Sequence, residues 1–220
     1  MKKVIIFGTG DLAKLIQKYL TRDSPHEIVA FTSHQKFINE KNIEGLPVIP
    51  FEKIEDKFPV DKFTMFIAVG YSELNKKREK IFIEAKNKGY ELLSYVHPST
   101  KLWDDFEMGE NCFIFENNVI QPSVKLGDNV IIWSNNVISH HCEIKDHNFI
   151  ISHVAIAGNV TIEPYCFVGM NATIRNSLTI AKECVIGAGT VILEDTKEGE
   201  VYVSNSTKKL PIRSNELKNI

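Results

Sequence analysis

An unbroken six-residue repeat of aliphatic residues constrains this chain more than any other feature of its sequence. Stepping by six over residues 102–192 meets an aliphatic side chain at sixteen consecutive positions. A period of six fits neither an α-helix nor a hairpin array. It fits short flat strands joined by tight turns, with three strands in each eighteen-residue coil. The repeat therefore predicts a parallel β-helix of about five coils, a prism whose interior holds the stepped side chains. These are Leu102, Met108, Ile114, Ile120, Leu126, Ile132, Ile138, Ile144, Ile150, Ile156, Ile162, Val168, Ile174, Ile180, Ile186 and Ile192.

A second series, two positions before the first, is also expected to point inward, because strand side chains alternate between the faces of a sheet. Its members are small or medium in size, as a narrow interior requires. All four cysteines of the chain fall in this series: Cys112, Cys142, Cys166 and Cys184. We therefore expect buried core thiols rather than metal ligands. One corner of the coils is marked by four residues spaced by eighteen, which favour positive φ: Asn117, Asn135, His153 and Asn171.

The first 97 residues follow a different pattern, in which apolar strands alternate with amphipathic helices. Strands are expected at residues 4–7, 27–32, 63–70 and 92–96, and helices at 11–20 and 72–88. Such alternation implies a small parallel sheet. The sequence thus predicts a Rossmann-like α/β domain over residues 1–97. An all-β domain with a C-terminal tail is predicted over residues 98–220.

A glycine loop follows the first expected strand, since residues 8–13 fit the pattern G-x-G-x-x-A. That pattern places backbone N–H groups at a helix start, where phosphate binds. A dinucleotide site would also place an acid at the end of the second strand, for the ribose. This strand ends in Thr32-Ser33-His34, without an acid. We therefore favour a nucleotide diphosphate over NAD, with a ligand-free βα turn as the alternative.

The bulk composition excludes several other classes of protein. The formal net charge is −2, which gives no sign of a nucleic-acid or membrane surface. No apolar run reaches the roughly 18–20 residues that a membrane span needs. The N-terminus shows no apolar segment followed by a small-residue cleavage site, so we expect no signal peptide and a cytoplasmic location.

Candidate chemistry rests on the histidines, because a prism of short strands has no deep pocket of its own. His140 and His141 are adjacent, and Gly158 comes eighteen residues after His140, one coil further on. We expect the bare glycine beside the histidine to leave room for an extended ligand, and its N–H to be an oxyanion donor. The alternative is that both histidines are ordinary surface or subunit-contact residues.

A zinc site is the rival interpretation of these histidines. Trimeric β-helix carbonic anhydrases use a pair of histidines spaced H-x4-H. Here His140, His141, His147 and His153 are separated by one, six and six residues. Six residues correspond to one face of the prism, so His147 and His153 are expected on different faces. We therefore expect no metal.

The order of the two domains and two motifs together resemble a known family. Phe7-Gly8-Thr9-Gly10 in the first domain and residues 140–144, His-His-Cys-Glu-Ile, in the second are similar to nucleotide-sugar N-acetyltransferases of bacterial glycan synthesis. The resemblance covers nearly the whole chain, and sialic acid O-acetyltransferases share the architecture. It implies a left-handed β-helix, a homotrimer, and acetyl-CoA bound between neighbouring subunits. The implied acceptor is a nucleotide-linked amino sugar, such as a 4-amino-4,6-dideoxyhexose, in surface glycan or O-antigen synthesis.

The resemblance also implies roles for individual residues. His140 is the general base on the sugar amine, within the family pattern H-[ED]-C-x-I, and His141 stands where the family has an acid. The group that orients His140 is therefore open between Asp146 and a residue of another chain. The acetyl-CoA side comprises Gly158, near the thioester, with Met170 and Ala188 lining the groove. The nucleotide-sugar side comprises Gly8, Thr9, Gly10, Asp11, Thr32, Ser33, Gly70, Tyr71, Asn75 and Arg78.

Several alternatives stay open at this stage. Tyr71 is equally compatible with packing, and Arg78 with a solvated helix surface. The family's closing G-x-P-A-K is altered at residues 203–208, so Lys208 or Lys209 is either a CoA-phosphate contact or part of a solvated tail. A sugar O-acetyltransferase, a zinc lyase and an inactive scaffold remain alternative functions. The base of the nucleotide (UDP, dTDP or GDP) and the position of the amine are not determined by the sequence.

Overall fold

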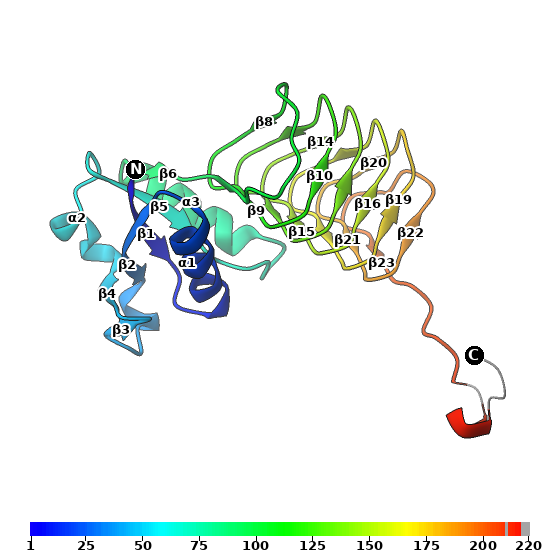
Figure 1. Ribbon diagram of the computed structural model, residues 1–220, viewed down its shortest axis with the longest axis horizontal. Helices are drawn as coiled ribbons and strands as arrows, with labels where there is room; N and C mark the ends of the chain where they lie inside the picture. The colour runs from blue at the N-terminus through cyan, green and yellow to red at the C-terminus, as the bar shows by residue number, and fades with distance from the viewer. Residues whose placement is uncertain (210, 217–220) are drawn as a thin grey trace.

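The computed structural model describes residues 1–209 and 211–216. Figure 1 shows an N-terminal α/β domain set against the beginning of a long prism of stacked coils. The C-terminal segment leaves the far end of the prism and carries a short 3-10 helix, Ser214–Glu216. The predicted order of the two domains is therefore the order observed.

The N-terminal domain is built on one six-stranded sheet in the order β3-β4-β2-β1-β5-β6. All neighbours in this sheet are parallel except β3 and β4, which are antiparallel. The strands are β1 (Lys3–Phe7), β2 (Glu27–Ser33), β3 (Asn42–Ile43), β4 (Leu46–Pro50), β5 (Phe63–Ile67) and β6 (Glu91–Leu92). The helices are α1 (Asp11–Asp23), α2 (Ile54–Lys57), α3 (Lys76–Asn87) and the 3-10 turns η1 (Gln35–Phe37) and η2 (Phe51–Lys53).

Three predicted boundaries in this domain are wrong. The strand expected over residues 63–70 ends at Ile67. Helix α3 begins at Lys76 rather than at residue 72, because Glu73, Leu74 and Asn75 all have positive φ and cannot continue a right-handed helix. The single strand expected over residues 92–96 is divided between two sheets. Its first part, β6, pairs with β5, whereas β7 (Tyr95–Val96) pairs with the first strands of the prism. The junction between the domains therefore lies a few residues before the predicted boundary at 97.

The prism has three faces, each a parallel sheet of two-residue strands. The β10 sheet contains β10 (Val119–Ile120), β13 (Val137–Ile138), β16 (Ala155–Ile156), β19 (Thr173–Ile174) and β22 (Val191–Ile192). The β8 sheet contains β8 (Glu107–Met108), β11 (Lys125–Leu126), β14 (Glu143–Ile144), β17 (Thr161–Ile162) and β20 (Thr179–Ile180). The β7 sheet contains β7, β9 (Phe113–Ile114), β12 (Ile131–Ile132), β15 (Phe149–Ile150), β18 (Phe167–Val168), β21 (Val185–Ile186) and β23 (Val201–Tyr202).

The interior of the prism confirms the six-residue repeat over 114–192, where every stepped side chain is buried. The two earlier positions differ, since Met108 is half-buried against this interior and Leu102 has 40% of its surface exposed. Leu102 has the expected register, since Lys101 pairs with Val119, but it lies in the first coil, which has no coil before it. All four cysteines are buried and free, as predicted. Burial raises the pKa of the Cys112 and Cys166 thiols to about 12.

The corners of the prism repeat a left-handed backbone conformation more widely than the sequence suggested. Asn117, Asn135, His153 and Asn171 have positive φ, as predicted. However, every sixth residue over 111–189 has positive φ, so all three corners turn in the same way. This conformation disfavours most side chains, and it accounts for the frequent asparagine at these positions. It also includes His141, with a φ of 57°.

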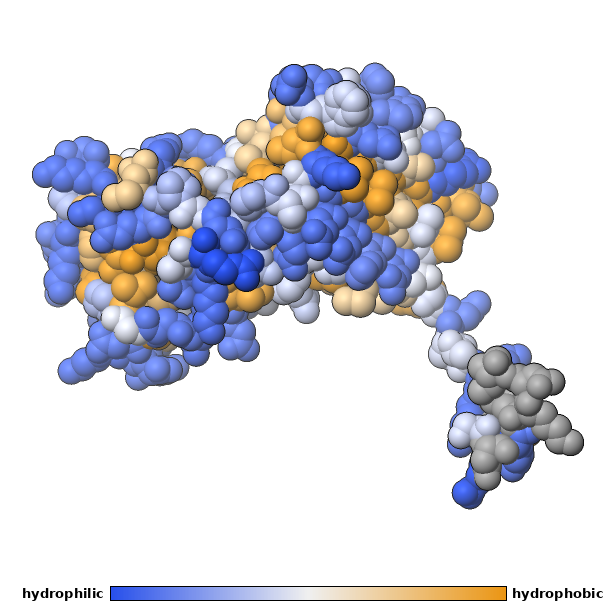
Figure 2. All heavy atoms as spheres, in the orientation of Figure 1, coloured by the Kyte–Doolittle hydropathy of each residue, from blue (hydrophilic) through white to orange (hydrophobic). Residues whose placement is uncertain are grey.

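The three faces of the prism differ in what covers their outer side. The aromatic side chains of the β7 sheet pack in one cluster with α1 and the N-terminal sheet. The β8 sheet turns charged and polar side chains outward, including Glu107, Lys125 and Glu143. By contrast, the β10 sheet exposes Val137 by 42% and Val191 by 59%. Apolar side chains reach the surface of the prism among polar ones in Figure 2.

Candidate active site

The largest cavity of the N-terminal domain has a volume of about 680 Å³ and lies where β1, β2 and β5 end. The strand order reverses direction on the two sides of β1, which is where open α/β sheets bind ligands. The N-terminus of α1 opens toward this cavity from the glycine loop. Of the predicted nucleotide-sugar residues, Gly8, Thr9, Gly10 and Ser33 line the cavity.

Gly8 is required by the path of the chain at this loop. Its φ is +130°, and a Cβ atom there would lie 2.6 Å from the carbonyl oxygen of Ala68. Any side chain at residue 8 would therefore push β1 and β5 apart at their carboxyl ends. Gly10 has open space around it and is the N-cap of α1, so a ligand can approach the first N–H groups of the helix.

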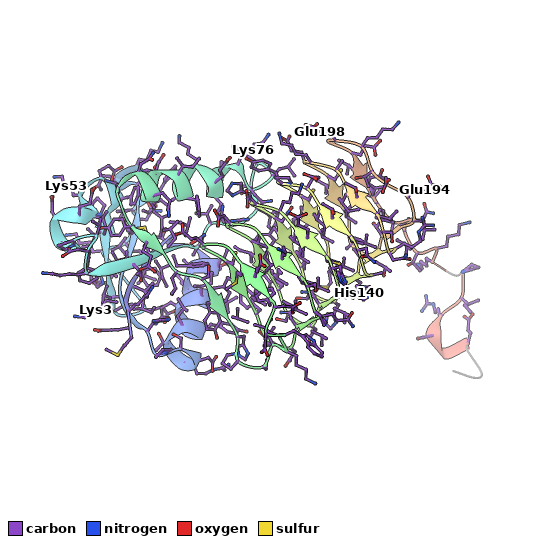
Figure 3. The ribbon with its side chains drawn as sticks, turned by 90° about the horizontal axis from the view of Figure 1, so that it is seen from above. Lys3, Lys53, Lys76, His140, Glu194 and Glu198 are labelled. Atoms are coloured by element: carbon purple, nitrogen blue, oxygen red, sulfur yellow. The ribbon has the colours of Figure 1, made fainter. Side chains whose placement is uncertain are left out.

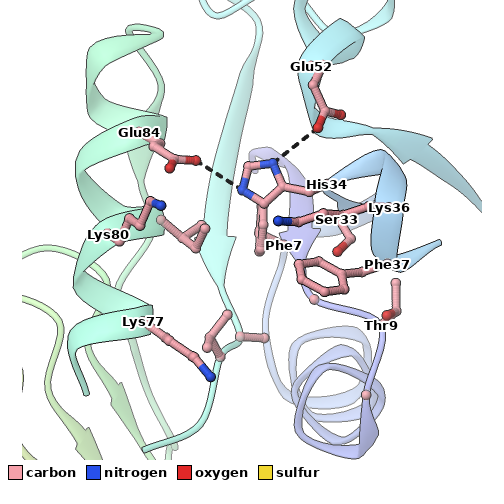
Figure 4. Close-up of a pocket in the computed structure, with 15 residues that line it drawn as sticks. Phe7, Thr9, Ser33, His34, Lys36, Phe37, Glu52, Lys77, Lys80 and Glu84 are labelled. Atoms are coloured by element: carbon pink, nitrogen blue, oxygen red, sulfur yellow. Dashed lines mark hydrogen bonds and ion pairs between the residues drawn. The ribbon is translucent and has the colours of Figure 1, made fainter. Parts of the chain in front are cut away.

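The cavity also holds charged residues that sequence reasoning missed. His34 lies between two carboxylates: its Nδ1 is 3.2 Å from Oε1 of Glu52, and its Nε2 is 3.1 Å from Oε2 of Glu84 (Figure 4). Lys36 from η1 and Lys77 and Lys80 from α3 line the same space. These residues come from three separate segments, namely residues 34–36, η2 and α3, so no local sequence motif predicts them.

The remaining predicted residues of the first domain lie outside this cavity lining. Thr32 is fully buried, and its Oγ1 donates to the carbonyl of Ile49 at 2.7 Å, which fastens β2 to β4. Asp11 is exposed in the first turn of α1. Gly70 follows β5, and the ring of Tyr71, 53% exposed, packs on Phe167 with centroids 4.7 Å apart. Tyr71 thus has a packing contact and an exposed part, and its contact with the sugar nucleotide stays a prediction.

Arg78 is neither a solvated residue nor a residue of the cavity, because it is fully buried between α3 and the prism. Its Nε donates to Oδ1 of Asn129 at 3.1 Å, and its Nη2 donates to the carbonyls of Asn129 and Asn148 at 3.0 and 3.1 Å. Its Nη1 donates to Oδ1 of Asn75 at 2.8 Å. Burial lowers the pKa of Arg78 to about 9, so the guanidinium remains charged at neutral pH. Arg78 and Asn75 thus have structural contacts at the junction of the domains, and their contact with the sugar nucleotide stays a prediction.

His140 lies on the prism, far from the part of the N-terminal domain marked by Lys3 and Lys53 in Figure 3. It occupies the corner between β13 and β14, and its side chain is exposed. Its backbone N–H is held by Oε1 of Gln121 at 3.0 Å. The corner therefore fixes the backbone of His140 and leaves its imidazole at the surface.

The predicted pairing of His140 with Gly158 is observed, but its physical reason differs from the expectation. A Cβ at Gly158 would lie 2.5 Å from Cε1 and 2.7 Å from Nε2 of His140. The space beside the glycine is thus filled by the imidazole itself and is not left for a ligand. The N–H of Gly158 has no acceptor among the described residues, so it can receive a developing negative charge.

His141 contacts His140 directly. The Nδ1 atoms of the two rings are 3.1 Å apart, and the rings meet edge to face. Asp146, the alternative orienting group, lies at the next corner, where its Oδ1 accepts the N–H of Asp128 at 2.7 Å. Within the chain, His141 is therefore the observed partner of His140.

Met170 and Ala188 are stacked at a different corner of the prism, as the hydrogen bond from Gly189 to the carbonyl of Met170 shows. That corner leads into β19, whereas the His140 corner follows β13. The His140 corner thus lies at the carboxyl ends of the strands of the β10 sheet, and the Met170 corner lies at their amino ends. One chain does not bring Met170 or Ala188 to His140. Lys208 and Lys209 are exposed in the C-terminal segment.

No cluster of three or more potential metal ligands occurs within residues 1–209 and 211–216. The same part of the chain contains no helix that is long and apolar enough to cross a bilayer. His147 and His153 lie at the two other corners of the prism, as their spacing predicted.

Comparison with known proteins follows the division into two domains. No curated protein matches the sequence significantly. Residues 3–85 match the PglD N-terminal domain. Residues 107–140 match the bacterial transferase hexapeptide of six repeats, and residues 159–194 match the hexapeptide repeat of succinyl-transferase. The chain joins a PglD N-terminal domain to transferase hexapeptide repeats. Both halves of the expected domain pair are therefore confirmed.

Several solved structures are similar in fold over nearly the whole chain. The acetyltransferase domain of PglB from Neisseria gonorrhoeae FA1090 matches with a TM-score of 0.80 at 22% identity, over 96% of this chain and 100% of that one. PerB from Caulobacter crescentus, in complex with CoA and GDP-perosamine, has a TM-score of 0.80 at 23% identity, over 91% and 93%. WeeI from Acinetobacter baumannii AYE has a TM-score of 0.79 at 21% identity, over 96% and 100%. These likenesses confirm the fold class, an α/β domain followed by a left-handed parallel β-helix.

Proposed function

We propose that this protein is an acetyl-CoA-dependent N-acetyltransferase that acts on a nucleotide-linked amino sugar. The observation that carries the proposal is the position of the His140 imidazole, which packs directly against Gly158, a residue without a side chain. Proteins of similar fold support the same chemistry, since PerB is described with CoA and GDP-perosamine and PglB with acetyl coenzyme A.

In the proposed reaction, the neutral amine of the sugar attacks the thioester carbonyl of acetyl-CoA. A C–N bond forms, and the amine proton passes to Nε2 of His140, which is the ring nitrogen that is not engaged with His141. The N–H of Gly158 donates to the oxyanion of the tetrahedral adduct. The adduct then collapses, the C–S bond breaks, and the departing thiolate takes the proton from His140. The products are the N-acetylated sugar and CoA.

The cavity beside the glycine loop is the proposed site of the nucleotide diphosphate. Backbone N–H groups at the start of α1 suit phosphate oxygens, and Lys77 and Lys80 add positive charge on the opposite wall. Hydrogen-bonding groups for a ribose or base are supplied by Ser33, at the end of β2, and by the pair that His34 forms with Glu52 of η2. The sugar would then extend out of the cavity toward a prism.

We further propose that the active site forms between subunits of a homotrimer. The exposed, largely apolar β10 sheet suits contact with other copies of the chain. His140 borders one edge of this sheet, and Met170 and Ala188 border the other. If three β10 sheets face a common axis, the His140 corner of one copy meets the Met170 corner of the next. Acetyl-CoA would lie in the groove between them.

The substrates also bear on location and role. Acetyl-CoA and nucleotide sugars are cytoplasmic metabolites, which supports a cytoplasmic enzyme. An N-acetylated nucleotide sugar is an activated precursor, which supports a role in surface glycan or O-antigen assembly.

The deciding experiment measures thiol release from acetyl-CoA with a panel of UDP-, dTDP- and GDP-linked 4-amino-4,6-dideoxyhexoses. We expect turnover with one nucleotide class, and a mass increase of the sugar that corresponds to one acetyl group. His140→Ala should reduce kcat by about 10² to 10⁴ while acetyl-CoA still binds. Free sialic acid in the same panel tests the O-acetyltransferase alternative. Turnover that is unchanged in the His140→Ala variant would remove His140 as the base.

A further inference from the structure

The contact between His140 and His141 determines how many protons the two rings can share. Their Nδ1 atoms are 3.1 Å apart, which is hydrogen-bond distance for two nitrogen atoms. A neutral imidazole carries one N–H and one bare nitrogen. Two bare Nδ1 atoms at this distance would repel, and so would two Nδ1–H groups. The geometry therefore requires one proton between them, carried by one of the two rings.

The engagement of Nδ1 decides which ring carries that proton in a working enzyme. Nδ1 of His140 faces His141, so Nε2 is the ring nitrogen of His140 that is left for the reacting amine. A base needs a bare nitrogen there. If Nε2 of His140 is bare, its Nδ1 carries the hydrogen and donates it to Nδ1 of His141. His141 is then the acceptor, and its own hydrogen lies on its Nε2.

Among the described residues, no side chain outside the pair is hydrogen-bonded to either ring. The coils before and after place uncharged residues against the two histidines: Pro122, Ser123, Gly158 and Asn159. Gln121 is engaged with the backbone N–H of His140. Glu143 lies two residues after His141 on β14, and Oδ2 of Asp105 accepts from Ser123 at 2.8 and 2.9 Å. Neither carboxylate is bonded to a ring of the pair.

We propose that His141 is a positioning residue that accepts the Nδ1 proton of His140 and thereby keeps Nε2 of His140 basic. This inference rests on the proposed function, in which His140 takes the amine proton. When it does so, the resulting imidazolium is stabilised through its hydrogen bond to neutral His141. A neutral acceptor stabilises that cation less than a carboxylate would.

The corner itself offers matched variants for a test. Ser123 and Ser177 occupy the equivalent position of other coils with φ of 61° and 59°, so His141→Ser suits the backbone. A serine side chain ends one bond short of the Nδ1 position and removes the acceptor. In His141→Asp, a carboxylate oxygen takes the place of Nδ1 and can only accept a hydrogen bond.

Steady-state kinetics over a range of pH gives the first readout. We expect His141→Ser to reduce kcat on the order of 10² with little change in KM for either substrate. The His141→Asp variant should keep kcat close to that of the wild type. The acid limb of its pH profile should move upward by about one pH unit, because the carboxylate favours the imidazolium. Wild-type kcat in the His141→Ser variant, or an identical acid limb in the His141→Asp variant, would overturn the proposal.

A second readout does not depend on turnover. Ring nitrogen NMR of the substrate-free, full-length protein distinguishes the two neutral tautomers of His140. We expect the Nδ1–H form in the wild type and a shift toward a mixture in His141→Ser. An Nε2–H form in the wild type would refute the role of His141 even if acetyl transfer is established. If the Nδ1–H form is found but no acceptor sugar is acetylated, the proposed function fails and the pairing of the histidines stands.

Discussion

The imidazole of His140 lies so close to Gly158 that a Cβ atom there would be 2.5 Å from its Cε1. Gly158→Ala should therefore displace the ring and reduce kcat on the order of 10², with a small loss of stability. Gly127→Ala is a matched control, because its Cβ would clash with Oδ1 of Asp146 at a corner that lacks these histidines. Thermal denaturation and kcat, measured for both variants, separate the two effects. Equal kcat values in the two variants would show that the packing of His140 against Gly158 is not required for turnover.

Lys77 and Lys80 should contribute to nucleotide affinity through their position in the cavity. Each change to methionine removes a charged donor near the proposed phosphates, so Kd for the nucleotide should rise on the order of 10-fold. Lys125→Met is the control, since Lys125 lies on the prism and pairs with Glu107. Calorimetric titration with UDP, dTDP and GDP measures the effect, which should weaken with added salt. Affinities that match the control would place the nucleotide elsewhere.

Arg78 should matter for stability and not for nucleotide binding. Arg78→Met leaves the carbonyl oxygen of Asn129 and the amide oxygen of Asn75 without a donor, whereas the carbonyl of Asn148 still accepts from the N–H of Ile131. Because buried acceptors without partners are costly, we expect a loss of about 3 kcal/mol in unfolding free energy. Urea denaturation measures that loss, and titration of the folded variant should give the wild-type nucleotide Kd. A stable variant that fails to bind nucleotide would return Arg78 to the binding site.

His147 should make the junction between the domains sensitive to acid. Burial lowers the pKa of His147, and its Nδ1 accepts a hydrogen bond from Asn129 at 2.9 Å, which the neutral ring alone can do. The stabilisation from a depressed histidine pKa is present above its unfolded value of about 6.5 and is lost as pH falls through the folded value. His147→Asn should therefore show a smaller decrease in Tm between pH 7 and pH 5 than the wild type. His153→Asn, at an exposed corner, should retain the wild-type pH dependence.

The prism was predictable because its signal is local and repeated. One aliphatic residue every six positions specifies the interior, and the buried cysteines follow from the alternation of side chains. The pairing of His140 with Gly158 follows from the same register, since neighbouring coils are eighteen residues apart. The steric requirement for a glycine at residue 158 could not be predicted, because the sequence does not specify the rotamer of His140.

The contacts of Arg78 were not predictable in the same way. Its hydrogen-bond partners, Asn129 and Asn148, are 51 and 70 residues away in the chain. An arginine on a polar helix next to lysines has the pattern of a solvated surface. Similarly, Glu52 and Glu84 meet at His34 from separate segments of the fold. Their proximity depends on how β4 and α3 pack on the sheet, which no short motif records.

Helix α3 borders the proposed nucleotide cavity on one side, through Lys77 and Lys80, and contacts the prism on the other, through Arg78 and Glu79. Exchange of the N-terminal domain for one with a different α3 would thus remove the side chains that contact the prism. Exchange of the prism would in turn remove the hydrogen-bond acceptors of Arg78. The two halves of the chain must consequently be inherited together. New nucleotide specificity is then most accessible through point changes on the far wall of the cavity, at Lys36 and Phe37, which do not touch that shared helix surface.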